Sequence, residues 1–313
     1  MANAREIQDR IKSINDTKKI TSAMYMISSS KLKKAKKALE NTEPYFFTLQ
    51  STIARILNHT ESDEIKQKYF EEGMTKPESE HRKGYIVVTA DKGLAGAYNH
   101  NVIKIAQEQL QKYPNNKLYV VGQVGMHYFE NRSIDIDHKF KYSMQNPTMN
   151  RSRNIAETVL DAYLNNELDE VYIIYTKMIN SMASEAEMLR LLPLKKGDFS
   201  EEILFNSEEQ GIEFEFIPSA GTVFETIVPN WISGLVYGAL VEAYCSEQNS
   251  RMMAMQSSTD NANEMLRELG IVYNRVRQAA ITQEITEVIS GAKAQKKKKM
   301  NREEDSSLSG QML

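Results

Sequence analysis

The chain has 313 residues, of which 41% are hydrophobic and 26% charged, and its formal net charge is −3. This balance excludes an intrinsically disordered protein, whose low hydrophobicity and high net charge prevent a core. It also provides no global excess of positive charge for nucleic acid. The single cysteine, Cys245, excludes an internal disulfide, and with no histidine or metal ligand nearby we expect it to act as a small buried hydrophobe.

Residues 1–59 are predicted to form one long helix, bent at Pro44, which removes a backbone donor. Apolar side chains return every three or four residues, as on a helix that packs on a partner. The predicted seam comprises Ile7, Ile11, Ile14, Ile20, Met24 and Ile27, and it continues on a shifted phase at Leu32, Ala35 and Leu39. The N-terminus has neither the apolar core of a secretory signal nor the acid-free composition of a transit peptide, so the protein is expected to work where it is made.

After a polar linker at residues 60–83, the periodicity changes. Short β-branched runs, "GYIVVTA", "KLYVVG" and "EVYIIYT", alternate with predicted helices at 99–112, 124–131 and 151–166. Strands that alternate with helices predict a mainly parallel sheet covered by helices. Residues 84–220 are therefore expected to form a Rossmann-like α/β domain, to which "MLRLLPL" and "IEFEFIP" add edge strands.

The helical pattern returns over residues 221–294. The predicted seam comprises Met265, Leu269, Val272, Val276, Ala279, Ile281, Ile285 and Ile289. Because a long helix gains most of its stability from packing, the two terminal helices are expected to pair, and the intervening domain makes the pairing antiparallel. The predicted fold class is α/β plus an antiparallel coiled coil. Residues 295–313, with a basic block, an acidic block and a Ser/Gly end, are expected to be a disordered tail.

The sequence shows no catalytic, cofactor-binding or metal-binding motif. "DKGLAGAYN" (91–99) lies between a strand and a helix, where an anion site can form, but it lacks the glycine spacing of a nucleotide site. A tight strand-to-helix turn is the favoured interpretation. The five histidines have no metal-ligand spacing. No run reaches the roughly 20 apolar residues of a membrane span, so any membrane contact is expected to be peripheral.

Four stretches resemble the gamma subunit of the F-type rotary ATP synthase. They are "ITSAMYMISSSKLKKAK" (20–36), "VTADKGLAGAYN" (88–99), "LLPL" (191–194) and "RMMAMQSSTDNANEMLRELGIVYNRVRQAAITQEITEVISGA" (251–292). The resemblance extends to about Ala294. It implies a noncatalytic rotor whose coiled coil turns inside a ring of alpha and beta subunits and whose α/β domain stands on the membrane c ring and the epsilon subunit.

The resemblance also implies specific contacts. Met24 and Arg251 match positions where the shaft meets loops of the beta subunits, and Arg277, Gln278 and Thr282 match positions that engage the beta catch loops. An arginine suits such a contact because its guanidinium is always charged and binds carboxylates bidentately. Without the resemblance, the sequence predicts only that each of these residues is a solvent-exposed residue on a helix surface. Neither a cofactor nor a metal is implied, and the location implied is the cytoplasmic face of a bacterial membrane.

Three departures from the family pattern bear on these expectations. The family usually ends near Gly291–Ala294, so the last nineteen residues are extra. Phe214 and Phe216 resemble foot residues near the c ring, but Ile217 stands where the family usually has an acid. With one cysteine, the chloroplast form's regulatory cysteine pair is excluded.

Two other functions fit parts of the sequence. A coiled coil that binds nucleic acid through the lysines of residues 31–37 would show steep salt dependence, but it leaves the α/β domain without a role. A nucleotide-dependent enzyme would bind its cofactor near residues 91–99, where the glycine spacing is wrong. The rotor is the predicted function.

Overall fold

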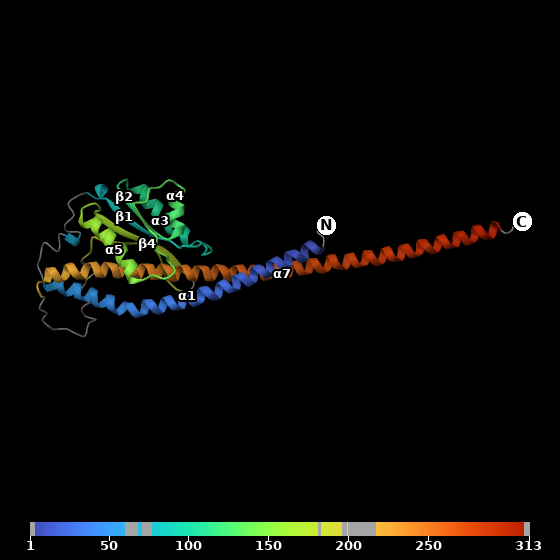
Figure 1. Ribbon diagram of the computed structural model, residues 1–313, viewed down its shortest axis with the longest axis horizontal. Coiled ribbons are helices and arrows are strands. Elements are labelled where there is room, and N and C mark those ends of the chain that lie inside the picture. The colour runs from blue at the N-terminus through green and yellow to red at the C-terminus, as the bar shows by residue number, and fades with distance from the viewer. Residues whose placement is uncertain are drawn as a thin grey trace. The chain divides into compact units, whose positions relative to one another are not determined.

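The computed structural model describes residues 4–59, 68–70, 77–180, 183–195, 199 and 217–309. The chain divides into two compact units. The first comprises residues 1–23 and 256–313, and the second comprises residues 24–255. Two long helices, α1 (Ala4–His59) and α7 (Ala220–Ser309), contribute segments to both units (Figure 1).

The second unit contains a five-stranded sheet in the order β3-β2-β1-β4-β5. The strands are β1 (Lys83–Val88), β2 (Asn116–Val121), β3 (His138–Phe140), β4 (Glu170–Met178) and β5 (Ser184–Leu192). Strands β1 to β4 pair in parallel, and β5 pairs antiparallel with β4. The predicted mainly parallel sheet is confirmed, and "MLRLLPL" supplies part of β5. Most of "IEFEFIP" lies outside the described residues.

Helices cover both faces of this sheet. They are α3 (Tyr98–Lys112), α4 (Gln123–Glu130) and α5 (Met149–Leu164), together with parts of α1 and α7. Alternation along β1 sends Tyr85 and Val87 towards α3 and α4, and Ile86 and Val88 towards α5, α1 and α7. Both faces are buried, which explains why the strands read as continuous apolar runs.

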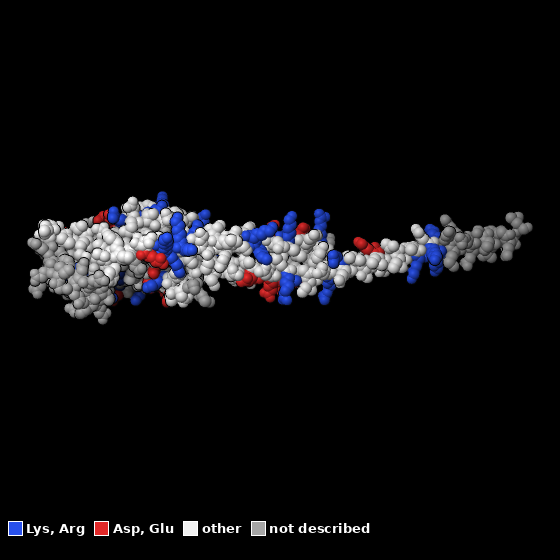
Figure 2. Space-filling view, turned by 90° about the horizontal axis from the view of Figure 1, so that it is seen from below, with Lys and Arg blue, Asp and Glu red and all other residues white. Residues whose placement is uncertain are grey.

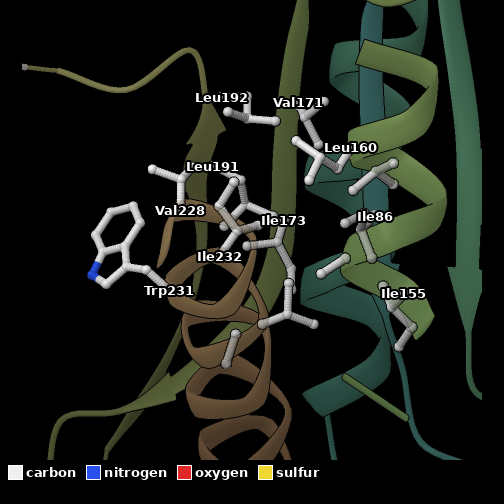
Figure 3. Close-up of a cluster of buried hydrophobic side chains, with 14 of the residues drawn as sticks. Ile86, Ile155, Leu160, Val171, Ile173, Leu191, Leu192, Val228, Trp231 and Ile232 are labelled. Atoms are coloured by element: carbon white, nitrogen blue, oxygen red, sulfur yellow. The ribbon is translucent and has the colours of Figure 1, made fainter. Parts of the chain in front are cut away.

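The α7 side of the sheet forms the larger core cluster. Figure 3 shows Val228 and Ile232 of α7 beside Leu191 and Ile173 of the sheet. Val228, Ile232 and Ile173 are fully buried, and burial of each such side chain contributes about 1.5–3 kcal/mol. This apolar contact attaches α7 to the α/β domain.

Within the second unit, α1 and α7 run antiparallel, as predicted. Ala35 of α1 clusters with Cys245 of α7, whereas Phe46, later in α1, packs on Gly234, earlier in α7. A Cβ on Gly234 would lie 2.2 Å from the Phe46 ring, so the glycine permits the close approach of the helices. Cys245 is buried, and burial raises the pKa of its thiol to about 11, consistent with the expected role as a small hydrophobe.

In the first unit, Thr21 and Thr259 join the two helices by a 2.8 Å hydrogen bond between their hydroxyls. Thr21 is buried, but Ile20, predicted at the seam, is 61% exposed. In the second unit Ser28 is buried and its neighbour Ile27 is 55% exposed. The predicted phase of α1 was therefore wrong by one residue at Ile20 and Ile27, whereas Leu32, Ala35 and Leu39, predicted on a shifted phase, are buried or half-buried.

The seam of α1 follows spacings of seven residues, and small polar side chains occupy it where larger apolar ones were expected. Buried or half-buried positions of α1 include Ile7, Ile14, Thr21, Ser28 and Ala35 in one row and Ile11, Lys18, Tyr25, Leu32 and Leu39 in the other. Along α7 the corresponding side chains are Met255, Thr259, Ala262, Leu266, Leu269, Tyr273 and Val276. These rows are the alternating three- and four-residue steps of a coiled coil.

Several predicted seam residues of α7 are exposed instead. Met265 and Val272 lie off the seam, and Ala279, Ile281, Ile285 and Ile289 belong to a stretch, from Arg277 to Lys298, in which every side chain is exposed. The antiparallel pairing explains this, because α1 begins at Ala4 and provides no partner further along α7. Apolar spacing alone does not reveal where the partner helix begins.

The expected disordered tail also differs from the structure, since α7 continues as a helix to Ser309. Alanine, glutamine, lysine and methionine, which dominate residues 292–300, are good helix formers. Figure 2 shows basic side chains gathered on the stretch of α7 just before its grey end, and this stretch contains Lys293, Lys296, Lys297 and Lys298. Charge blocks were therefore a poor guide to disorder here.

A charged cluster is buried where β1 and β4 begin. It comprises His81, Lys83, Glu170 and Tyr172, and we call it the buried charge cluster. The Glu170 carboxylate accepts hydrogen bonds from the Tyr172 hydroxyl and pairs with the His81 ring, and the Lys83 ammonium lies 3.3 Å from it. Burial alone would raise the pKa of Glu170, but these hydrogen bonds and the Lys83 charge hold it below its ordinary value.

We expect Gly122→Ala to destabilise the α/β domain by roughly 2–3 kcal/mol. Gly122 has φ +95°, and a Cβ there would lie 2.0 Å from the carbonyl oxygen of Thr89. Urea unfolding followed by fluorescence of Trp231, the single tryptophan, measures the loss. Gly238→Ala is the matched control, because its Cβ meets no atom within 4 Å, and there a gain of up to about 1 kcal/mol is expected. Equal effects at both glycines would contradict the prediction.

Candidate partner-contact surface

Among the residues that the structure describes, no group of three or more His, Cys, Asp or Glu side chains is placed to hold a metal ion. In the same part of the chain, no helix is long and apolar enough to cross a membrane. The residues predicted to contact partner subunits fall into two groups, one in each unit.

In the second unit, the structure brings Met24 and Arg251 together around one cavity. Met24 is half-buried. Arg251 is only 8% exposed, and its guanidinium binds within its own chain. It pairs with Glu247 at 2.7 Å and donates to the carbonyl oxygens of Lys92 and Gly93 at 3.2 and 3.1 Å.

Arg251 therefore ties α7 to the loop that follows β1. Asp91 fixes the other side of that loop, because its carboxylate accepts hydrogen bonds from the Met144 amide at 2.8 Å and the Ser143 hydroxyl at 3.1 Å. The loop turns at Leu94 and Gly96, which have positive φ values of 65° and 58°. The motif interpreted as a tight turn is thus a turn held by charged groups from two sides.

Glu247 was missed in the sequence. It is 5% exposed, and burial raises the pKa of its carboxyl while the Arg251 charge lowers it, with burial prevailing. The sequence does indicate that Glu247 and Arg251 can form an ion pair, since they are four residues apart on a predicted helix and so share a face. Its burial was not predictable, because it depends on the loop that α7 packs against.

In the first unit, Arg277, Gln278 and Thr282 are all exposed on α7. The Thr282 hydroxyl donates to the Gln278 carbonyl oxygen at 2.9 Å, so it is held against its own helix. Gln278 and Thr282 are one turn apart and lie on one face. The structure makes these three side chains available to a partner, and their contacts with beta loops stay a prediction. Phe214 and Phe216 lie outside the described residues.

Exposed apolar side chains continue along this part of α7. Ile281, Ile285, Val288 and Ile289 are each about half or more exposed and follow helical spacing. Single exposed apolar residues are ordinary, but a stripe of them on an unpaired helix is typical of a protein interaction surface. The lysines of residues 31–37, in contrast, are exposed or half-buried and follow no single face.

Comparison with known proteins gives consistent matches over almost the whole chain. A family model described as ATP synthase matches residues 3–295. The ATP synthase gamma chain of Acetivibrio thermocellus is 44% identical over 299 residues, which cover 95% of this chain and all of the relative. That of Ruminiclostridium cellulolyticum is 43% identical over 293 residues, covering 93% and 98% of the two chains.

A solved structure shares the fold. The match is to a chain in the mitochondrial ATP synthase of Euglena gracilis, in an assembly of OSCP, F1 and c-ring, with a TM-score of 0.63 and 17% identity. The alignment covers 93% of this chain and 94% of that one. At this identity the likeness bears on the fold alone, and it agrees with two long helices around an α/β domain.

Proposed function

The chain belongs to the ATP synthase gamma chain family, and we infer that it is the central-stalk rotor subunit of an F-type ATP synthase. It couples ion flow through the membrane c ring to ATP synthesis or hydrolysis at the beta subunits. The observation that carries this inference is the 44% identity that spans the full length of a curated relative. The nucleotide sites lie on partner subunits, so this subunit is noncatalytic.

The two long helices suit a mechanical role. A rotor shifts the equilibrium of a beta subunit only where its surface contacts that subunit's conformations differently. Such a surface must differ around the axis, and the exposed stretch of α7 provides this, because Ile281 and Ile285 share one face with Gln278 and Thr282, whereas Gln283 and Glu287 lie on the opposite face.

The proposed contacts follow from this role. Arg277, Gln278 and Thr282 engage catch loops of the beta subunits, and Met24 meets a beta loop at the edge of the second unit. The Arg251 guanidinium already has three partners in its own chain, so we assign it chiefly the positioning of the loop after β1. Phe214 and Phe216 are assigned to the foot, which contacts the epsilon subunit and the c ring.

The location proposed is the cytoplasmic face of a bacterial membrane, held there through the complex. The close relatives are bacterial, and one, from Acetobacterium woodii, is named as sodium ion specific. The nucleic-acid alternative receives no support from any relative, and the lysines of residues 31–37 are assigned to acidic surfaces of neighbouring subunits and to solvent.

Rotation of the assembled complex tests the function. The complex is purified from its native membrane, the alpha and beta subunits are identified, and the hexamer is fixed to a surface. A cysteine at Lys104, whose side chain is 67% exposed, carries a bead, while buried Cys245 with its raised thiol pKa stays unlabelled. The bead is expected to rotate when ATP is added. ATP hydrolysis with a stationary bead, or recovery of the chain without alpha and beta, would reject the rotor.

Deletion of residues 295–313 should leave assembly and ATPase activity nearly unchanged. The family match ends at residue 295, so the family's function does not require this segment. Subunit composition by gel filtration and the steady-state ATPase rate measure the outcome. A large loss of either would assign the last turns of α7 a working role.

A further inference from the structure

A cavity of about 250 Å³ lies in the second unit at the carboxyl end of β1. Its walls are α1 around Ser28 and Lys31, the loop of residues 91–94, and α7 around Gln248. Strand β1 connects through α3 to β2 on one side and has β4 as its neighbour on the other, so the strand order reverses here. In open α/β sheets, ligands bind at this point, outside the carboxyl ends of the strands.

Two deeply buried polar side chains line the cavity. Gln248 and Ser28 are each 2% exposed. Both side chains border the cavity, so a group held there can accept a hydrogen bond from the Gln248 amide or the Ser28 hydroxyl.

The charges around the cavity favour an anion. Its two acids, Asp91 and Glu247, are already engaged, the first by the Met144 amide and the Ser143 hydroxyl and the second by Arg251. Two further cations line the cavity, Lys31 and Lys92, and the Lys31 charge acts on Glu247 by lowering the pKa of its carboxyl. With Arg251, the three cations of the wall outnumber its two acids, so the net charge around the cavity is positive and an oxyanion is the complementary group.

A second cavity, of about 230 Å³, adjoins the first and shares Lys31 and Gln145 with it. Its walls include Tyr237 and Tyr244 of α7 and Ala35 of α1. Aromatic and small apolar walls suit a flat, apolar group. The two cavities together present a cationic, hydrogen-bonding end and an aromatic end, joined at Lys31.

We propose that this pair of cavities is a binding site for a small organic anion, in which a phosphate or carboxylate lies against Lys31 and Gln248 and a flat apolar group lies against Tyr237 and Tyr244. The site joins α1, α7 and the loop after β1, so an occupant strengthens their contacts. Met24 lines the same cavity, which places the occupant beside a side chain assigned to the beta contact.

Titration of the full chain with phenyl phosphate tests the site. Parallel titrations use benzoate, which carries a carboxylate in place of the phosphate, and inorganic phosphate and phenol, which each carry only one of the two groups. Calorimetry or ligand-observed NMR gives the dissociation constants. Phenyl phosphate or benzoate is expected to bind at least tenfold more tightly than phosphate or phenol alone, and the better of the two identifies the oxyanion. Saturable binding of none of them, which would mean a cavity filled by solvent only, overturns the proposal.

Matched variants locate the binding. Lys31→Met and Gln248→Met should each weaken it about tenfold, the loss expected for a hydrogen bond to a charged group. Lys33→Met and Gln256→Met, exposed neighbours on the same two helices, should leave it unchanged. Lys31 is half-buried and at the cavity wall, so Lys31→Met should fold even if Gln248→Met does not. Equal binding by Lys31→Met and the unmodified chain would overturn the proposal.

Discussion

Glu170→Gln is expected to lower the free energy of unfolding of the α/β domain by about 3–5 kcal/mol, the cost of breaking a buried ion pair. Glu170 is 5% exposed and Lys83 is 3% exposed, so removal of the carboxylate leaves a buried ammonium without its buried partner. Urea unfolding at neutral pH, followed by Trp231 fluorescence, measures the loss. Glu78 does not compensate, since its side chain is 71% exposed where it meets Lys83.

The loss should depend on pH in a defined direction. Because the pKa of Glu170 is below its ordinary value in the folded chain, its contribution is fully present above the unfolded pKa of about 4.3 and falls as the pH drops through the folded pKa. The difference between the two proteins should thus shrink in acid. Lys83, whose pKa is raised despite its burial, loses its contribution as the pH rises through that raised value.

Two further variants decide whether pairing is the cause. Glu130→Gln removes a carboxylate from an exposed pair with Lys139, and no measurable change in stability is expected. The double variant Glu170→Gln/Lys83→Met should lose less than the sum of the single losses, because it removes both charges. Additive losses would show that Glu170 and Lys83 do not stabilise the fold as a pair.

Arg251→Met is expected to cost a similar amount, about 3–5 kcal/mol, because it leaves Glu247 buried without its cation. It also removes both hydrogen bonds to the carbonyl oxygens of Lys92 and Gly93. The amides of residues 91–97 should therefore exchange with solvent more quickly. Urea unfolding measures the first effect, and hydrogen exchange followed by mass spectrometry measures the second.

The double variant Arg251→Met/Glu247→Gln separates these two effects. It should recover much of the stability, because no uncompensated charge is left. The amides of residues 91–97 should still exchange quickly, because the loop is still released from α7. Arg267→Met, at an exposed position on the same helix, should change neither. If the double variant restored slow exchange, Arg251 would not be what holds the loop.

The architecture followed from the sequence because its elements are strongly patterned. Continuous apolar strands, intervening helices and long terminal segments almost free of proline each have one favoured structure. The exposed positions of Arg277 and Gln278 were equally accessible to sequence reasoning, since nothing in the pattern buried them. These features depend on residues close together in the chain.

The remaining errors concern features that depend on distant residues. Isoleucine at 20 and 27 suggested the seam, but the helices pair through Thr21 and Ser28, since small side chains let two backbones approach closely. The burial of Arg251 depends on carbonyl oxygens about 160 residues earlier in the chain. Gln248 and Ser28 come to line one cavity only because α1 and α7 pack on the same loop.

The hydrogen bond between Thr21 and Thr259 spans 238 residues, which has a consequence for biosynthesis. At roughly 5–20 residues per second, α1 leaves the ribosome about 10–50 s before the matching part of α7 is made. During that interval the α/β domain, whose parallel strands lie between the two helices in the chain, is the part able to fold. Its folding brings the start of α7 near the end of α1, which reduces the entropy lost in joining the chain's two ends. The lysines of residues 31–37 then have a second use, because they keep a helix that awaits its partner charged and soluble.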